Sequence, residues 1–571
     1  MTLKLTPSSL KLCQLLFLIA TINSGFAQIT DRELPKEWDS LIYGGQFSDR
    51  FLPIPIIGDI TDRTWGVSGV IPRDISNGIE HPDWSYWGGR YFQSEDGKYN
   101  GFICRWSEND PKGHFAYHES EIVWVQSDNP IGPYKPVGEP IGLGHNPNVF
   151  RLNDGRWVVY TIGKGYDVFY YISKTLNGPW STDRFQFDLR DREQLFPMVN
   201  VSFSKREDGA FLAVPRAGDI WISQTGISTY HRLTNDRVYP PIEGKFEDPV
   251  IWKDHIQYHV IVNDWLGRIA YHLRSKDGVK WKTDPGKAYF PGISIYEDGT
   301  QTNWYKYERI RVLQDEYGRA IQANFAVIDS TKHSDLQDDN HSSKNISIPL
   351  VKDRFLKLLN KEKIDESTKE IKVLLSAEED FNPIKEVDVS SLRLGASEQV
   401  NFGNGCRLIT SKKKGKDLLL VFDARGHGLN ADNFAIKLLG KTKNGKLLTG
   451  YAKLPWVQYV EPILSSRKPY IEEQLLKIEV QNFGQISSKE ETIIIEVQTQ
   501  DREYQFEGAV KPLDSFETTL VSVEKPDGLE STTKGNILVY LKGDKTQILY
   551  QREHDLQYLE RATFTGASKK K

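Results

Sequence analysis

Two stretches of the sequence share one pattern, in which a polar cluster leads into a hydrophobic strand, a turn and a second, aromatic strand. The stretch 144–160 begins Gly-His-Asn-Pro-Asn-Val-Phe, and the stretch 246–264 begins Phe-Glu-Asp-Pro-Val-Ile-Trp. This repetition is typical of β-propeller blades, each of which sends residues at the head of its first strand to a common centre. We therefore expect five blades, with heads near Asp83, His145, Asn200, Glu247 and Glu308.

A second repeated signature supports a period near the length of one blade. Segments that start at Ser127, Ser173 and Ser275 each follow an expected strand and end in a glycine-containing turn and an aromatic residue. Their starting serines are 46 and 102 residues apart, about one and two periods of roughly 50 residues. The high content of tryptophan, tyrosine and phenylalanine suits β-structure, and exposed aromatic rings suit the C–H faces of sugars.

The N-terminal segment 1–27 is predicted to be a secretory signal peptide. Lys4 and Lys11 precede the apolar run 15–20, and small residues at Gly25 and Ala27 occupy the positions that a signal peptidase reads. The apolar run is much shorter than the roughly 20 residues that a membrane-spanning helix needs. We expect an exported protein without a membrane span, located in the periplasm, at the cell surface or secreted.

The remainder is predicted to be an all-β chain: a five-bladed β-propeller followed by two small β-sandwich domains. Short strands bounded by Gly, Pro, Asn and Asp dominate the propeller region, and alternating hydrophobic runs mark the sandwich strands further on. The expected divisions are a propeller at 36–330, a linker at 331–370, a β-sandwich at 371–458, an immunoglobulin-like β-sandwich at 459–555 and a tail at 556–571.

Composition narrows the classes of ligand. The 73 basic and 77 acidic residues give a net charge of −4 and no large field of one sign, which argues against nucleic acid. Beyond the signal peptide only Cys104 and Cys406 remain, which we expect to be buried and free; they are too few for a cysteine zinc site. We expect no cofactor, no catalytic metal and a monomer, although a propeller channel leaves room for a structural Ca²⁺.

Several motifs in the propeller region carry a family resemblance. They are Trp87-Gly88-Gly89, Glu95-Asp96-Gly97-Lys98-Tyr99, Arg105-Trp106, Ser120-Glu121-Ile122-Val123, Ser127-Asp128-Asn129-Pro130, His145-Asn146-Pro147, Glu247-Asp248-Pro249 and Glu308-Arg309. In order and spacing they resemble the five-bladed propeller hydrolases around glycoside hydrolase family 43, over roughly residues 60 to 330. The resemblance implies an Asp on the first blade as general base, a second Asp that tunes and orients, and a Glu on a later blade as general acid.

Carried over to this sequence, the resemblance implies Glu247 as the acid, Asp248 as a second candidate carboxylate and Asp83 as the base. Two departures stand out. Proline precedes Asp83 where the family places it after the Asp, and Asn146 and Asn200 stand at strand heads where the family offers Asp. Adjacent residues of a regular strand point to opposite faces, so Glu247 and Asp248 are not expected to act as the catalytic pair.

Eight further residues are candidates for substrate binding: His145, Asn146, Trp84, Trp87, Asn200, His259, Glu308 and Arg309. Arg309 suits a carboxylate or sulfate on an acidic sugar, because a guanidinium makes paired hydrogen bonds. Each assignment has a structural alternative. The Glu-Asp-Pro element could form an ordinary turn, and His145 could contact backbone groups at a blade edge. The Glu308-Arg309 pair could form an ion pair within the last blade, and the tryptophans could pack between blades.

The leading hypothesis is an exported glycoside hydrolase acting on oligosaccharides from plant or algal polysaccharides by general acid and base carboxylates. The alternative keeps the propeller but assigns β-elimination on a uronic acid, by a lyase or dehydratase that uses His118, His145, His259, Tyr117, Tyr166 or Arg309. A third hypothesis is a glycan-binding protein without catalysis. Convergence of Asp83 and Glu247 favours hydrolysis, whereas a His, Tyr and Arg cluster favours elimination.

Overall fold

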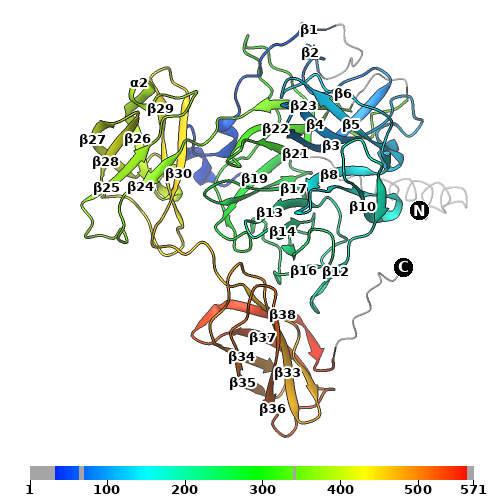
Figure 1. Ribbon diagram of the computed structural model, residues 1–571, viewed down its shortest axis with the longest axis vertical. Helices are drawn as coiled ribbons and strands as arrows, with labels where there is room; N and C mark the ends of the chain where they lie inside the picture. Colours follow the sequence, from blue (N-terminus) through cyan, green and yellow to red (C-terminus); the bar gives the residue numbers. More distant parts are fainter. Residues whose placement is uncertain (1–31, 63–69, 338–342, 562–571) are drawn as a thin grey trace, which may run out of the picture.

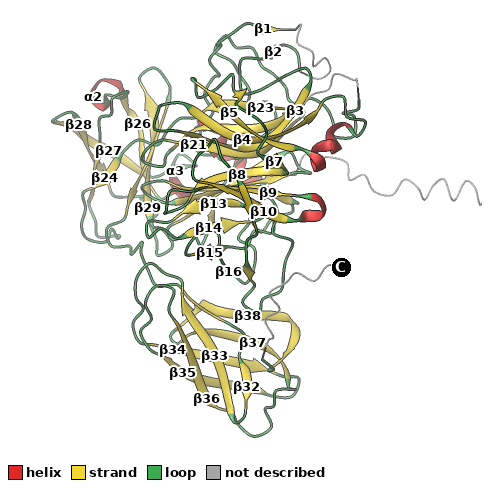
Figure 2. Ribbon diagram, turned by 45° about the vertical axis from the view of Figure 1, so that its right-hand side comes forward, coloured by secondary structure: helices red, strands yellow, loops and turns green. Residues whose placement is uncertain are grey.

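The protein is described here from a computed structural model, which covers residues 32–62, 70–337 and 343–561. Most of the regular secondary structure in these residues is β-strand, and the helices are short (Figure 2). Three units follow one another along the chain: a large N-terminal unit, a second unit beside it, and a C-terminal unit at the far end of the molecule (Figure 1). The predicted signal peptide, 1–27, lies outside the described residues.

The large unit contains five successive sheets in which neighbouring strands are antiparallel, apart from one short parallel pair in the third sheet. The first comprises β3 (Trp84–Gln93), β4 (Tyr99–Ser107), β5 (Glu121–Ser127), β6 (Lys135–Pro136) and β7 (Gly142–Leu143). The second comprises β8 (His145–Arg151), β9 (Trp157–Ile162), β10 (Val168–Ser173) and β11 (Ser181–Asp183). The third comprises β13 (Ser202–Lys205), β14 (Phe211–Val214), β15 (Trp221–Ser223) and β16 (Tyr230–Arg232), with β12 (Phe187–Asp188) parallel to β16.

The last two sheets complete this unit. The fourth comprises β17 (Phe246–Lys253), β18 (Tyr258–Asp264), β19 (Ile269–Ser275) and β20 (Lys282–Thr283), and the fifth β21 (Lys306–Gln314), β22 (Ala320–Ile328) and β23 (Ser343–Pro349). Outside these five sheets lie a two-stranded sheet of β1 (Ile60–Thr61) and β2 (Arg73–Asp74). The 3₁₀ helices are η1 (Lys36–Ser40), η2 (Phe47–Arg50), η3 (Gly113–Glu119) and η4 (Lys164–Tyr166).

The first strands of the five sheets form a closed ring. Neighbouring strands pack against one another in the order β3, β8, β13, β17, β21 and back to β3. The segment before the first sheet helps to close the ring, because Ile79 pairs with Asn345 on β23, with 2.9 Å from Ile79 N to Asn345 O. The predicted all-β propeller class is confirmed by this architecture.

The expected boundary between the propeller and the linker is wrong. Residues 343–349 form β23, which pairs along its whole length with β22. Its polar sequence, Ser-Lys-Asn-Ile-Ser-Ile-Pro, hid this strand, because Lys344 and Asn345 are buried through hydrogen bonds rather than through apolar packing. The second unit also begins earlier than expected. β24 (Leu356–Leu358) lies inside the segment assigned to the linker and pairs with β25 (Glu370–Leu375) of the second unit.

The two C-terminal units are β-sandwiches with separate apolar cores. The second unit continues with α2 (Pro383–Glu386), β26 (Val387–Gly395), α3 (Ser397–Val400), β27 (Cys406–Lys414), β28 (Asp417–Asp423), β29 (Ala435–Thr442) and β30 (Leu447–Lys453). The third contains β31 (Leu464–Ser466), β32 (Tyr470–Glu472), β33 (Leu475–Asn482), β34 (Glu491–Gln498), β35 (Glu503–Val510), β36 (Thr518–Glu524), β37 (Lys534–Leu541) and β38 (Asp544–Tyr558). The expected tail thus begins inside β38.

Buried arginines attach the third unit to the third propeller sheet. Arg190 donates hydrogen bonds to Gln481 Oε1 (2.8 Å) and to Ser465 O (3.0 Å), and Arg192 donates to Leu549 O (2.7 Å). Both arginines are at most 5% exposed. Because charged groups are buried only where they find partners, this interface fixes the third unit against the propeller.

Two smaller expectations concern cysteines and membrane spans. Cys104 and Cys406 are both buried and free, as the sequence predicted. Within residues 32–62, 70–337 and 343–561, no helix has the length and apolar character needed to cross a bilayer.

Candidate active site at the centre of the ring

Each of the five strand heads carries one residue in the left-handed backbone region. These residues are Gly88 (φ 63°), Asn146 (φ 55°), Asn200 (φ 54°), Asp248 (φ 54°) and Arg309 (φ 55°). Register shifts accompany them in four of the five sheets, which marks a β-bulge at equivalent places around the ring. Bulges redirect side chains, and left-handed residues other than glycine concentrate at functional sites. These five positions therefore define one level around the ring, which we call the bulge level; four of them carry side chains.

The bulge overturns the expectation that Glu247 and Asp248 point to opposite faces. The register of β17 against β18 shifts between Glu247 and Val250, so regular alternation does not apply here. Contacts show that both carboxylates face the other strand heads: Glu247 contacts Asn200, and Asp248 contacts Arg309. Glu247 is partly exposed, whereas Asp248 is fully buried.

Asp248 and Arg309 form a buried ion pair. Arg309 Nη1 donates to Asp248 Oδ1, while Asp248 Oδ2 has no hydrogen-bond partner among the described residues. Burial raises the pKa of Asp248 to about 6, although Arg309 opposes the shift and the nearby Glu247 adds to it. A carboxyl group with such a pKa can change its protonation state near neutral pH, as a catalytic acid or base must.

Glu308 is held in a second buried cluster. Its carboxylate forms an ion pair with Lys306 and accepts a hydrogen bond of 2.7 Å from Lys332. Burial alone would raise the pKa of Glu308, but the two lysines and Arg309 outweigh it and hold that pKa below its usual range. Glu308 is fully buried, so its assignment to substrate binding finds no support in these contacts. The alternative of a Glu308–Arg309 ion pair is replaced by the two lysines, because Arg309 pairs with Asp248.

A chain of amides leads to Glu247. Asn146 Nδ2 donates to Asn200 Oδ1 (2.8 Å), and Asn200 Nδ2 donates to Glu247 Oε1 (3.0 Å). Arg216, on the loop between β14 and β15, places Nη1 at 3.2 Å from Glu247 Oε1. Arg216 is not predicted by the sequence pattern, because no strand-head motif marks this loop. The two asparagines are almost fully buried, so they position Glu247 rather than offer a free binding surface.

His145 lies in an aromatic group on one side of the same level. Its ring is 5.3 Å from that of Tyr117 and 5.7 Å from that of His118, both on or beside η3. Burial lowers the pKa of His145 to about 3, assisted by Arg309, and burial raises the pKa of Tyr117 to about 12. At neutral pH His145 is therefore uncharged and Tyr117 keeps its proton.

The low pKa of His145 predicts acid sensitivity of the fold. Below the unfolded pKa of about 6.5 the unfolded chain binds a proton that folded His145 refuses, so stability falls as the pH falls. Between pH 7 and pH 5 this residue should account for a loss of about 2 kcal/mol in the free energy of unfolding. Denaturant titrations of wild type and His145→Gln at both pH values measure it. The variant should lose about 2 kcal/mol less than wild type, the exposed control His81→Gln should match wild type, and an equal loss in all three contradicts the assignment.

Asp83 and Trp84 do not reach this site, so their assignments are wrong. Asp83 lies five residues before the bulge at Gly88, roughly 16 Å along an extended strand, and its side chain is 75% exposed beside His81. Trp84 packs beneath Arg105, with 4.0 Å from the guanidinium carbon to the ring centre. In β3 more residues precede the bulge than in β8 or β17. The residue at the start of β3 is therefore not equivalent to the residues at the starts of β8 and β17, and Asp83 does not lie at the ring centre.

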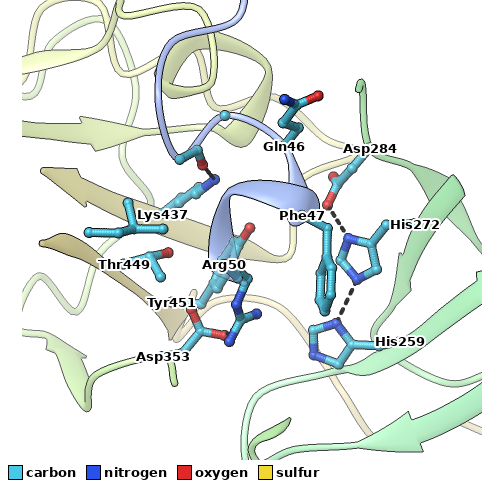
Figure 3. A pocket seen from close by; sticks show the side chains of 13 residues that line it. Gln46, Phe47, Arg50, His259, His272, Asp284, Asp353, Lys437, Thr449 and Tyr451 are labelled. Carbon is cyan, nitrogen blue, oxygen red and sulfur yellow. Dashed lines mark hydrogen bonds and ion pairs between the residues drawn. The ribbon is translucent and has the colours of Figure 1, made fainter. Parts of the chain in front are cut away.

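Trp87 and His259 are also wrong as substrate-binding residues. Trp87 is 1% exposed and packs edge-on against His114. His259 stacks on Trp252 at 4.6 Å and shares a 3.0 Å hydrogen bond with His272. Figure 3 shows this histidine pair in a cavity that the second unit also lines, through residues such as Lys437 and Tyr451. His259 is thus part of the contact between the propeller and the second unit.

Metal binding finds no support at the ring centre. In the part of the chain that the structure describes, no group of three or more His, Cys, Asp or Glu side chains is arranged to hold a metal ion. The carboxylates of the site are instead paired with arginine and lysine.

Comparison with known proteins places the chain beside glycoside hydrolases at low identity. No protein-family model and no curated protein matches it. Among solved structures, a protein named only as a glycoside hydrolase is 11% identical, covering 79% of this chain and 97% of its own, with a TM-score of 0.35. Zg3597, a family 117 glycoside hydrolase of Zobellia galactanivorans, is 10% identical (48% and 88% covered, TM-score 0.34). The GH43_1 enzyme of Xanthomonas citri is 9% identical (48% and 91%, TM-score 0.32).

Proposed function

We propose that this protein is a glycoside hydrolase that acts, after export, on oligosaccharides derived from plant or algal polysaccharides. One observation carries the proposal: two carboxyl groups, Glu247 and Asp248, meet at the centre of the ring in different environments. Glycosidic cleavage needs one carboxyl group to donate a proton to the leaving oxygen and another to activate water or attack. A pair of titratable groups in contrasting surroundings meets this need.

Glu247 is assigned as the proton donor, because it is the carboxylate of the pair that is partly exposed. Asp248 is assigned as the base, with Arg309 holding one oxygen and leaving the other without a partner among the described residues. Asn146 and Asn200 position Glu247 and are not assigned a proton-transfer step in the reaction.

The base assignment predicts the acid side of the pH profile. Asp248 works as a base only when ionised, and its pKa is raised to about 6. We therefore expect kcat/KM to fall about tenfold per pH unit below about pH 6. Steady-state values of kcat/KM between pH 4 and pH 8 measure this decrease on the acid side of the profile. A rate that stays constant down to pH 4 contradicts the assignment of Asp248.

The substrate class is tested by incubating the full chain with a panel of plant and algal oligosaccharides and measuring new reducing ends. Hydrolysis produces one reducing end per bond without an unsaturated sugar. Cleavage of at least one member supports the proposal. Binding without turnover across the panel, with the protein folded, favours the third hypothesis of a glycan-binding protein.

A second candidate, β-elimination on a uronic acid, is favoured by the group of Tyr117, His145 and Arg309 at the same level. A neutral histidine or tyrosine suits proton transfer at C5, and an arginine suits neutralisation of the uronate carboxylate. The absence of Asp83 from the ring centre also removes the convergence that favoured hydrolysis. Ultraviolet absorbance of an unsaturated product separates the two reactions: its appearance assigns elimination, and reducing ends without it assign hydrolysis.

A further inference from the structure

Phe196 is a large apolar side chain that stays exposed beside the candidate acid. It is 38% exposed and lies on the segment that leads from β12 to the strand head at Asn200. Backbone pairing ties this segment to the loop between β14 and β15, because Arg216 N donates to Val199 O at 3.0 Å. Phe196 therefore lies at the end of the third sheet where Asn200 meets Glu247.

Arg216 connects the Phe196 ring to Glu247. Its guanidinium carbon lies over the ring, 4.9 Å from the ring centre, and its Nη1 lies 3.2 Å from Glu247 Oε1. These two contacts keep the ring centre within about 10 Å of the Glu247 carboxylate, a span that one sugar ring can bridge. Arg216 thus holds an aromatic surface next to the acid.

The exposure of Phe196 sets it apart from the phenylalanines of the strands nearby. Phe203 on β13 and Phe211 on β14 are at most 2% exposed and pack the core of the third sheet. Pro197 follows Phe196 and restricts the backbone at the base of the ring. A ring that is held in place but not used for packing is suited to binding, because little freedom is lost when a ligand covers it.

The position of the acid decides which part of a substrate meets this ring. A proton donor must come within about 3 Å of the oxygen that it protonates. The sugar attached to that oxygen, the leaving sugar, therefore lies next to Glu247. It must extend outward, because Asn200 and Asp248 on the inner side of Glu247 are almost fully buried. Phe196 is the exposed ring that Arg216 ties to Glu247, and aromatic faces suit the C–H faces of sugars.

We propose that Phe196 is the platform for the leaving sugar, which stacks on the ring while Glu247 protonates the linking oxygen. Arg216 is a positioning residue that holds the ring beside the acid. This inference rests on the proposed function, because it names the part of the substrate that the same site binds. It follows that the protein recognises a disaccharide or a longer chain better than the single sugar.

Calorimetric titration of the full chain carrying Glu247→Gln tests the inference, because this variant should bind glycans without cleaving them. The probes are xylobiose, cellobiose and galactobiose, with xylose, glucose and galactose as single-sugar counterparts. At least one disaccharide should bind about 10-fold more tightly than its single sugar, because its second unit covers the ring. Adding Phe196→Leu should weaken that disaccharide about 3- to 10-fold and leave the single sugar unchanged.

Two further variants separate a platform from a structural role. Leucine keeps an apolar contact with Arg216 but has no flat face, whereas Phe196→Tyr keeps the ring and should hold disaccharide affinity within about twofold. The matched control is Tyr317→Leu, which should bind as the starting variant does. Tyr317 is 48% exposed, carries Arg319 at 5.5 Å and lies in the hairpin between β21 and β22, at the other end of β21 from Arg309.

Four results overturn the inference: equal affinity for single sugars and disaccharides, weakening of both in Phe196→Leu, the same loss in Phe196→Tyr as in Phe196→Leu, or no binding of any disaccharide. If wild type still cleaves a glycan in such a case, the proposed function stands without this platform. Disaccharide binding that depends on the ring, with no cleavage of any glycan by wild type, would instead overturn the proposed function and leave the platform standing.

Discussion

Arg309→Met is expected to lower the free energy of unfolding by about 3–5 kcal/mol, because it leaves the buried Asp248 carboxylate without its partner. Methionine keeps most of the length of the side chain, so the loss reports the charge more than the packing. Equilibrium denaturation at pH 8 measures the effect, since Asp248, whose pKa is raised to about 6, is ionised there in the wild type.

The double variant Arg309→Met with Asp248→Asn is the matched control. It removes both charges, so most of the lost stability should return. Arg184→Met serves as a second control, because Arg184 is 64% exposed and pairs with a half-exposed Asp167. An exposed pair contributes at most about 1 kcal/mol. A loss of similar size in Arg184→Met and Arg309→Met would contradict the view that the ring centre is held together by a buried ion pair.

Glu247→Gln is expected to lower kcat on the true substrate by about 10²- to 10⁴-fold, the usual contribution of general acid catalysis. Glutamine keeps the shape and accepts the hydrogen bond from Asn200, but it has no proton to give to a leaving oxygen. Steady-state rates on the best substrate of the panel measure the loss. KM should change little, because the substitution removes a transition-state interaction rather than a binding contact.

The fold must be unaffected for this result to be informative. Glu247 is partly exposed and its partner Arg216 is a quarter exposed, so Glu247→Gln should leave the thermal midpoint within a few degrees of wild type. A variant that keeps full activity removes Glu247 from the acid role. A variant that loses activity together with several degrees of stability instead assigns Glu247 to the structure.

Much of the fold could be predicted from the sequence, because alternation, turn residues and repeated strand heads are local signals. The Asp-Gly pairs at hairpin tips illustrate this, since Gly155 and Gly209 take up the left-handed conformation that such turns require (φ 88° and 87°). The strand β23 was not predicted, because Lys344 and Asn345 are polar and yet buried, and their hydrogen-bond partners lie far away in the sequence. Tertiary hydrogen bonds of this kind leave no periodic trace.

The candidate site was predicted in part, through Glu247, Asp248, His145, Asn146, Asn200 and Arg309, which the structure brings to one level. A signal for that level was present in the sequence: Gly, Asn and Asp, the residues that tolerate left-handed backbone, stand at four of the five heads. The prediction of Asp83 assumed that the residue nearest the start of each strand faces the centre, but Asp83 lies far from the bulge of its strand. Arg216 could not have been found, because a loop of one blade brings it to Glu247 from outside the repeat.

The most direct test compares Glu247→Gln with Asp83→Asn on the same substrate, under the same conditions and with both proteins shown to be folded. If catalysis takes place at the level of the bulges, Glu247→Gln should lose at least about 100-fold in kcat. Asp83→Asn should stay within about twofold of wild type, because that side chain is exposed at the rim. Loss of activity in Asp83→Asn with retention in Glu247→Gln would contradict the account and move the catalytic centre to the outer end of the first strand.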